Sequence, residues 1–317
     1  MVYVGIDGGG SKTRFACYDG AGRLLGAATL ESAHYRQEDL AATANTLAEG
    51  IGAVSNGLDA REIGACVGLS GYGEDAVADA EAVQELGRRL APVSLRFYND
   101  ATVGWAGALA LQSGIVINGG TGSIAYGRDP HGHEARCGGW SEYFSDEGSG
   151  YWLGKKTLEL FAKQSDARAP KGALHGIVRR HFALQDDYAL VGIVKRVYAG
   201  SRDKTASLQM LLLEAAEQGD VSARECYGEA AKELALIVCG AARQLDFGGA
   251  KIDVSYMGGL FHLRSLILEP MTRALEKCID ANVFAPKLSP CAGAALFAVQ
   301  AFAPELLGRF KSGLLHL

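Results

Sequence analysis

The sequence predicts an α/β protein of two lobes that open with the same motif. Residues 2–26 and residues 114–136 each contain an apolar stretch, a glycine-rich turn with hydroxyl residues, a second apolar stretch and a polar turn. Apolar stretches then alternate with segments of helical periodicity, which is typical of a mainly parallel sheet covered by helices. A long helical block in the second half indicates that the second lobe carries an insertion.

In the first lobe we expect three strands before the stretch that starts at Ser32, followed by alternating helices and strands. Leu40, Ala44 and Leu47 recur at the spacing of one helix face. Residues 63–69 form an unbroken apolar run, which indicates a buried strand. The remaining elements expected in this lobe are a helix near residues 77–90, a strand at 93–98 and a helix at 101–111.

The second lobe should repeat the three-strand opening and then become mostly helical. We expect the lobes to comprise residues 1–114 and 115–302, with a C-terminal helix of about 303–317 packing back on the first. The helical insertion should occupy about residues 155–246. Three elements should follow it: a strand at 252–257, a helix at 263–279 broken or kinked at Pro270, and a final helix at 292–302.

Composition excludes several classes of function. The chain has 317 residues, a net charge of −5 and no basic block, which argues against nucleic acid or anionic membranes as partners. The start of the chain lacks the charged and apolar regions of a signal peptide, and no apolar run approaches the length of a membrane span. The seven cysteines are scattered without a CxxC pair, so we expect free thiols in a reducing, cytoplasmic compartment.

The first glycine turn, residues 8–13, has the composition of a phosphate-binding loop. It fails the Walker A pattern because Ser11 separates Gly10 from Lys12, and it leads into a strand rather than a helix. Bare backbone N–H groups suit anions, and Asp7 beside them could hold Mg²⁺ directly or through water. The alternative is a glycine-rich hairpin that binds no ligand.

The second glycine turn, residues 119–123, matches the first, and Asn118 takes the place of Asp7. Taken alone, this turn could be an ordinary tight hairpin. Two such turns at equivalent points of a duplicated motif could hold a polyphosphate from both sides. The duplication therefore predicts a phosphotransferase or an ATPase.

Two further segments carry candidate chemistry. Asp100 follows a predicted strand and precedes a helix, so it is either a helix cap or a general base that takes a proton from a hydroxyl. Residues 137–150, called the aromatic loop below, combine glycines, aromatic residues and acids. Trp140 could be a core residue and Asp146 a helix cap, but together they favour a sugar site. The Gly258-Gly259 pair, taken alone, indicates an ordinary strand–helix turn.

These segments resemble those of one protein group. The turns GIDGGGSKT and INGGTGS, the segment SYMGGLF and the loop CGGWSEYFSDEGSGYWLG are similar to the BadF/BadG/BcrA/BcrD ATPases of the actin/Hsp70/sugar-kinase superfamily. The loop resembles most the N-acetylglucosamine kinase branch. The resemblance covers nearly the whole chain and implies an actin-like, ribonuclease H-like fold of duplicated βββαβαβα domains. It also implies ATP and Mg²⁺ as cofactors, an amino-sugar substrate and a homodimer.

The resemblance also implies a role for each matching residue. Asp100 becomes the base for the sugar 6-hydroxyl, and Asp7 the carboxylate linked to Mg²⁺. Gly258 and Gly259 would lie near adenosine. The residues implied to bind phosphate are Gly8, Gly9, Gly10, Ser11, Lys12, Thr13, Gly120, Thr121, Gly122 and Ser123. Those implied to line the sugar site are Ser70, Asp100, Thr121, Gly139, Trp140 and Asp146.

One departure from this pattern concerns the acceptor. N-acetylglucosamine kinases have an Asn after the third strand, where this chain has Ala33. His34 and Arg36 could instead favour an acidic substituent, as on N-acetylmuramic acid, or could simply face solvent. The expected activity is therefore 6-phosphorylation of N-acetylglucosamine or a close relative. Glucosamine or N-acetylmuramic acid as acceptor, or an ATPase switch protein that has no sugar substrate, are the alternatives.

Overall fold

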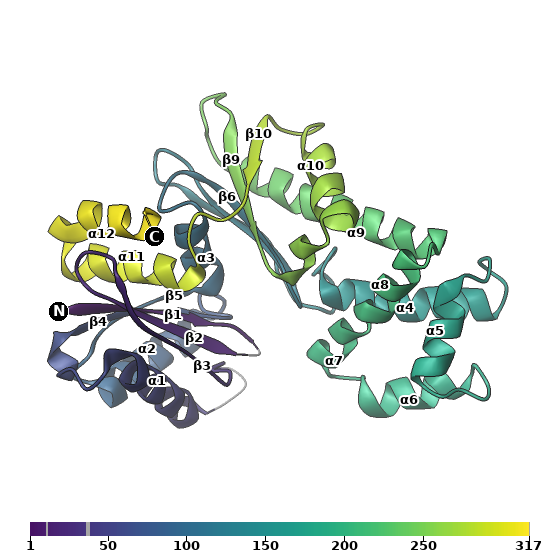
Figure 1. The fold of residues 1–317 in the computed structure, drawn as a ribbon, viewed down its shortest axis with the longest axis horizontal. Helices are drawn as coiled ribbons and strands as arrows, with labels where there is room; N and C mark the ends of the chain where they lie inside the picture. Colours follow the sequence, from purple (N-terminus) through teal and green to yellow (C-terminus); the bar gives the residue numbers. More distant parts are fainter. Residues whose placement is uncertain (11, 36–38, 317) are drawn as a thin grey trace. The chain divides into compact units, whose positions relative to one another are not determined.

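The computed structural model describes residues 1–10, 12–35 and 39–316. The chain divides into two compact units (Figure 1). Unit 1 contains Met1–Val116 together with Phe284–Leu317, and unit 2 contains Ile117–Val283. The chain therefore passes from one unit to the other twice.

Unit 1 is built on a five-stranded sheet in the order β3-β2-β1-β4-β5. The first three strands form an antiparallel meander. Strand β4 pairs in parallel with β1, and β5 pairs in parallel with β4. The parallel strands are joined by helices, as the alternation in the sequence predicted. The strands are β1 (Val2–Gly8), β2 (Thr13–Tyr18), β3 (Leu24–Leu30), β4 (Ile63–Leu69) and β5 (Ser94–Asn99).

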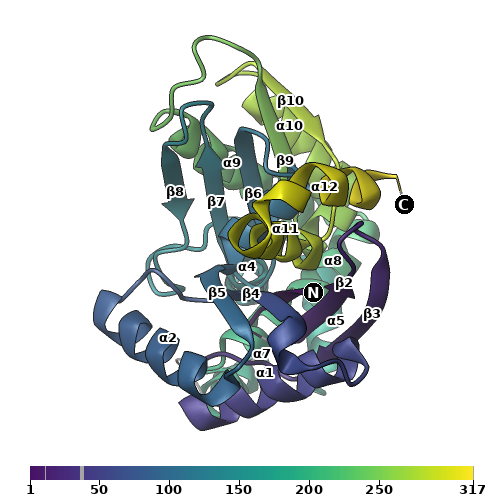
Figure 2. The same ribbon diagram turned by 90° about the vertical axis from the view of Figure 1, so that its left-hand side faces the viewer.

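Unit 2 repeats this topology. Its sheet has the order β10-β9-β6-β7-β8, so β6 occupies the place of β1, and the predicted duplication is confirmed (Figure 2). The strands are β6 (Gly114–Gly119), β7 (Ser123–Arg128), β8 (Glu134–Gly138), β9 (Ile252–Met257) and β10 (Ala281–Phe284). The edge strand β10 was not predicted, because four residues are too few for an alternating pattern to be recognised.

Helices cover both faces of the first sheet. On one face, α1 (Leu40–Ser55) and α2 (Ala76–Leu90) bury Val4 and Ile6 of β1 in the core. On the other face lie α3 (Asp100–Ala108), α11 (Pro290–Phe302) and α12 (Leu307–Leu315). Tyr3 of β1 meets Phe310 of α12 edge-on at 5.7 Å between ring centroids. Successive β1 residues thus point to opposite faces, and the strand is buried on both.

The position of α11 corrects the predicted domain boundary. The sequence prediction placed residues up to 302 in the second lobe, but α11 packs on β1 and α3 within unit 1. Helix α11 lies close to β1 and α3 because glycines at the contacts have no side chain to separate the backbones. A Cβ at Gly5 would overlap the Cys291 carbonyl and lie 2.7 Å from Ala295 N, and one at Gly293 would lie 2.8 Å from Gly107 Cα.

The helical insertion of unit 2 lies between β8 and α9 (Val221–Ala242). It comprises α4 (Gly150–Ser165), α5 (Ala173–His181), α6 (Ala189–Val197), α7 (Arg202–Ser207) and α8 (Gln209–Glu217). The next helix, α9, packs on β7 and β8, as α1 packs on β2 and β3 in unit 1. Within the described ranges, no helix combines the length and apolar character that a membrane span requires.

The helix predicted at residues 263–279 is shorter and less regular than expected. A π-helical turn, Arg264–Leu268, precedes α10 (Glu269–Leu275), and Pro270 lies in the first turn of α10. Proline is tolerated there because the first N–H groups of a helix have no partner within it. Pro270 therefore marks where the α-helix begins.

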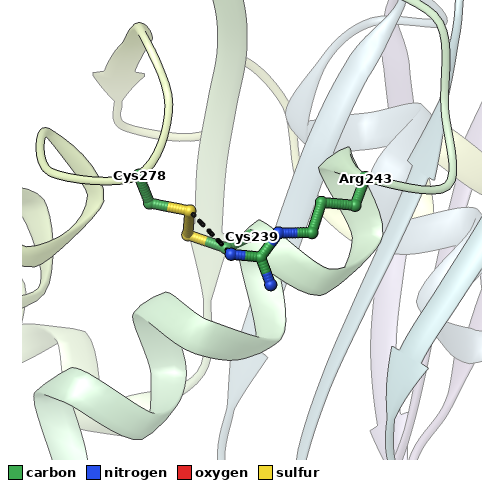
Figure 3. Close-up of a disulfide and its surroundings, with 3 residues drawn as sticks. All are labelled: Cys239, Arg243 and Cys278. Atoms are coloured by element: carbon green, nitrogen blue, oxygen red, sulfur yellow. Dashed lines mark hydrogen bonds between the residues drawn. A yellow bond between two sulfur atoms is a disulfide. The ribbon is translucent and has the colours of Figure 1, made fainter.

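Two of the cysteines expected to be free thiols form a disulfide. Cys239 on α9 and Cys278 beyond α10 are bonded, with their Cα atoms 6.4 Å apart (Figure 3). Nη2 of Arg243 lies 3.8 Å from the Cys278 sulfur. The prediction was wrong because the two residues are 39 positions apart, and only the packing of α9 against α10 brings them together.

We predict that Gly5→Ala destabilises the protein by about 1–3 kcal/mol or more, because the new methyl group must displace the backbone of α11. Thermal or denaturant unfolding would measure the loss. Gly52→Ala is the matched control, since Gly52 lies inside α1 with open space around it. That substitution should stabilise the helix by about 0.5–1 kcal/mol. Equal stability of the Gly5→Ala variant and the wild type would contradict the described packing.

Candidate functional site

The predicted site residues of unit 1 gather at one edge of its sheet. Gly8 at the end of β1 pairs with Leu69 at the end of β4, which pairs with Asn99 at the end of β5. Asp7, Ser70 and Asp100 lie at or next to these three strand ends. The Ser70 N–H donates to the Gly8 carbonyl at 3.0 Å. Ligands of open α/β sheets bind at such carboxyl ends.

The first glycine turn is held by the segment that follows β3. Gly9 N–H donates to the Lys12 carbonyl at 3.1 Å. Ser32 Oγ donates to the Gly9 carbonyl, and the buried Thr13 Oγ1 accepts from Ala33 N–H at 2.9 Å. The buried Ala33 therefore contributes its backbone to the shape of this turn. Ser11, and the Arg36 of the acceptor hypothesis, lie outside the described residues.

Asp7 is a mostly buried carboxylate with a cationic neighbour. Its register partner on β2 is Arg14, whose Nη1 lies 3.2 Å from Asp7 Oδ2. Burial raises the pKa of the Asp7 carboxyl above its ordinary value, and the Arg14 guanidinium opposes that rise. The sequence analysis missed Arg14, although its position opposite Asp7 follows from the hairpin register. No cluster of three or more potential metal ligands occurs among the described His, Cys, Asp and Glu residues.

Asp100 occupies the first turn of α3. The capping role that the sequence left open for it belongs to Asn99, whose Oδ1 accepts from Ala101 N–H at 2.9 Å. The Asn99 amide also donates to the Tyr72 carbonyl at 2.7 Å, which fixes the cap to the segment after β4. Asn99, and not Asp100, thus caps α3 and fixes the position of Asp100. The Asp100 carboxylate also accepts a hydrogen bond from Ala101 N–H.

The second glycine turn is tied to the start of α4. Gly150 N–H donates to the Gly120 carbonyl at 2.9 Å, and Tyr151 N–H donates to the Thr121 carbonyl at 3.0 Å. Across the part of the chain that the structure describes, the N–H groups of Thr121 and Gly122 donate to no protein acceptor. With its carbonyl groups held by the helix, the turn keeps these two donors available for an anion.

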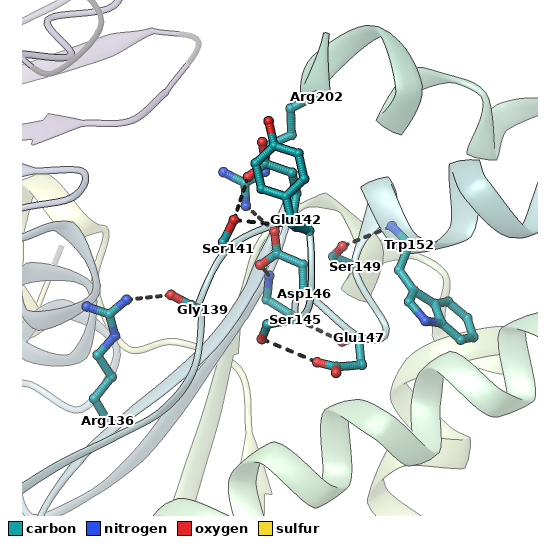
Figure 4. Close-up of polar contacts among 12 residues, drawn as sticks. Arg136, Gly139, Ser141, Glu142, Ser145, Asp146, Glu147, Ser149, Trp152 and Arg202 are labelled. Carbon is teal, nitrogen blue, oxygen red and sulfur yellow. Dashed lines mark hydrogen bonds and ion pairs between the residues drawn. The ribbon is translucent and has the colours of Figure 1, made fainter. Parts of the chain in front are cut away.

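The aromatic loop is hydrogen-bonded to the second glycine turn through Ser123, and Figure 4 shows the polar contacts within the loop. Ser123 N–H donates to Asp146 Oδ1 at 3.1 Å, and Ser123 Oγ donates to the Glu147 carbonyl at 2.7 Å. Asp146 is only 1% exposed and adopts a left-handed backbone with φ +63°. It does not cap α4, since Ser149 accepts from Trp152 N–H in that role.

The aromatic residues of this loop face away from the core. Trp140 is 75% exposed, which excludes the core role left open by the sequence, and Tyr143 and Phe144 are also exposed. Two glycines with positive φ, Gly138 and Gly139, precede Trp140, and Arg136 donates to the Gly139 carbonyl at 2.6 Å. The indole is therefore presented on a turn whose backbone is held in place.

The Gly258-Gly259 pair lies against the second glycine turn. Gly258 has φ +99°, and a Cβ there would overlap the Gly119 carbonyl and lie 2.9 Å from Asn118 Oδ1. Gly259 has open space around it. Segments more than a hundred residues apart in sequence are thus adjacent in unit 2. Asn118 is the penultimate residue of β6, just as Asp7 is in β1.

Over most of its length the chain is similar to one family of ATPases. The model of the BadF/BadG/BcrA/BcrD ATPase family matches residues 4–298. The chain is 31% identical over 270 residues to the N-acetylmuramic acid/N-acetylglucosamine kinase of Clostridium acetobutylicum, covering 83% of this chain and 86% of that protein. It is 29% identical over 315 residues to the N-acetyl-D-glucosamine kinase of Dictyostelium discoideum, covering 94% and 98%.

Among solved structures, a candidate N-acetylglucosamine kinase from Chromobacterium violaceum matches with a TM-score of 0.75 and 25% identity, over 94% of this chain and 98% of that one. The duplicated sheets and their helices are those of an actin-like ATPase. The chain belongs to the BadF/BadG/BcrA/BcrD ATPase family.

We predict that Arg14→Gln raises the pKa of Asp7 further, because it removes the cation that opposes the effect of burial. Any step that needs the Asp7 carboxylate ionised should then require a higher pH, so the acidic limb of ATP turnover should move upward. Carboxyl ¹³C NMR titration and a pH–rate profile would measure the two shifts. Arg23→Gln is the control: it disrupts the exposed pair with Asp19 and should change neither the Asp7 pKa nor the pH–rate profile. An Asp7 pKa that is the same in Arg14→Gln and the wild type would refute the assigned role of Arg14.

Proposed function

We propose that this protein is an ATP-dependent amino-sugar kinase. It transfers the γ-phosphate of MgATP to the 6-hydroxyl of N-acetylglucosamine or a close relative. The observation that carries the proposal is the aromatic loop, which presents the exposed Trp140 ring and is hydrogen-bonded to a turn with two available N–H donors. An aromatic ring on a loop that is hydrogen-bonded to a phosphate-binding turn suits a sugar that receives a phosphoryl group. The names of the Clostridium and Dictyostelium relatives support the same substrate class.

In this mechanism Asp100 is the general base. It accepts the proton of the sugar 6-hydroxyl as the hydroxyl oxygen attacks the γ-phosphorus, and ADP leaves with the electrons of the broken P–O bond. Such a reaction depends mainly on positioning and charge neutralisation rather than on covalent chemistry by the protein. The Asn99 cap fixes the start of α3, and therefore fixes where Asp100 lies.

The glycine turns bind the phosphates through backbone N–H groups, and Gly258 and Gly259 lie near adenosine. Asp7 fits the expected magnesium ion, because Mg²⁺ is usually held by one or two carboxylates, substrate phosphates and waters. When bound, the ion would neutralise charge on the phosphates. Ser70 in unit 1 and Thr121, Gly139 and Trp140 in unit 2 are the residues that we propose for sugar binding. Asp146, also expected among them, holds the loop through bonds to its neighbours.

The acceptor is tested by a coupled assay of ADP release with N-acetylglucosamine, glucosamine, N-acetylmuramic acid, N-acetylmannosamine and glucose. We expect the highest kcat/KM with an N-acetylated amino sugar and a 6-phosphorylated product by mass spectrometry. A preference for N-acetylmuramic acid would favour the alternative acceptor named by the Clostridium relative. ADP release that no sugar stimulates would contradict the proposal and favour an ATPase switch protein.

Asp100→Asn should lower kcat by about 10²–10⁴-fold, the usual contribution of a general base. The amide retains the size of the side chain, so α3 and nucleotide affinity should be preserved. Steady-state kinetics and calorimetric titration with a non-hydrolysable ATP analogue would separate the two effects. Asp59→Asn, in the loop before β4, is the control with unchanged turnover. A kcat of the Asp100→Asn variant near that of the wild type would remove Asp100 as the base.

A further inference from the structure

An arginine that the sequence analysis did not single out lies at the second glycine turn. Arg202 is the first residue of α7, in the helical insertion. Its Nη2 donates to Asp146 Oδ2, and the two side chains point toward one another in Figure 4. A Cβ at Gly122 would overlap this guanidinium and lie 2.7 Å from Asp146 Oδ1. Glycine at position 122 therefore makes room for the ion pair.

The ion pair joins three separate segments. Asp146 comes from the aromatic loop, Arg202 from the insertion, and Ser123 N–H from the end of the turn itself. The Asp146 carboxylate is 1% exposed, whereas the Arg202 side chain is 42% exposed. A buried carboxylate without a partner is strongly destabilising, so the conformation of Asp146 depends on the arginine.

Asp146 also keeps a backbone conformation that non-glycine residues rarely adopt. Its own carbonyl accepts from Ser149 N–H at 3.1 Å, and Ser149 caps α4. The first residues of α4 in turn hold the Gly120 and Thr121 carbonyls. The available N–H groups of Thr121 and Gly122 thus lie between two anchors, α4 on one side and the Asp146–Arg202 pair on the other.

We propose that Arg202 is a positioning residue for nucleotide binding. Acting through Asp146, it holds the second glycine turn in the form whose N–H groups bind the nucleotide phosphates. The inference rests on the nucleotide-binding half of the proposed function and is independent of which sugar is the acceptor. It assigns part of the phosphate site to the helical insertion. No sequence spacing indicates this role, because Arg202 and Asp146 lie in different segments.

The test is a double-mutant cycle read by calorimetric titration with the magnesium complex of a non-hydrolysable ATP analogue. Arg202→Ala and Asp146→Asn should each weaken binding by at least about tenfold, as expected for losing a charged hydrogen bond. Because Arg202 acts through Asp146, the double variant should be no weaker than the weaker single variant. Arg202→Lys, which keeps the charge, should restore part of the affinity. Lys204→Ala, an exposed charge on the same helix, should bind as the wild type does.

Circular dichroism melting checks that each variant folds. If Arg202→Ala does not fold, the double variant and Arg202→Lys still decide the question, because neither leaves an unpaired buried charge. The inference would be overturned if the single variants bound the nucleotide analogue as tightly as the wild type, or if their losses of affinity were fully additive in the double variant. It would also be overturned if the only effect were a higher KM for the sugar. If the wild type binds the nucleotide but phosphorylates no sugar, the kinase proposal fails, while the cycle still measures the role of Arg202.

Discussion

Unit 1 depends on the backbone contact of α11 with β1 and α3. Gly5, Gly107 and Gly293 lie where a methyl group would overlap neighbouring backbone. Protein interiors are close-packed and respond to the addition of a single methyl group. This contact fixes α3 against the sheet, and α3 begins with Asp100. The helix–helix crossing therefore sets where the proposed base lies relative to Asp7 at the end of β1.

Each glycine turn is accompanied by a buried carboxylate and an arginine. In unit 1 the pair is Asp7 and Arg14, on adjacent strands of one hairpin. In unit 2 it is Asp146 and Arg202, which come from a loop and an inserted helix. Duplication thus retained the backbone turn, while the charged partners come from different elements. Because a buried carboxylate is destabilising when its cationic partner is removed, both arginines are informative positions for mutation.

Much of the fold follows from local patterns. Residues 63–69 and 252–257 were predicted as strands with the bounds of β4 and β9: the first is an apolar run, and the second contains Ile252, Val254 and Tyr256 and runs into the Gly258-Gly259 turn. Other features depend on contacts between distant segments. The pairing of Cys239 with Cys278, the packing of α11 in unit 1 and the approach of Arg202 to Asp146 leave no signal at short spacing. The roles proposed for Asp100 and the glycine turns stay predictions.

The location of α11 also has a consequence for biosynthesis. During translation β1 emerges before the other strands of unit 1, but the helix that packs against Gly5 is made from Pro290–Phe302, which follow all of unit 2. Until then, only α3 of the three helices on that face of the first sheet has been made. Residues 117–283, synthesised in between, contain every strand and helix of unit 2 beyond the start of β6. Domains generally fold as units in the order of synthesis. Here the synthesis of unit 1 starts before that of unit 2, but unit 1 can complete its fold only after unit 2 has been made.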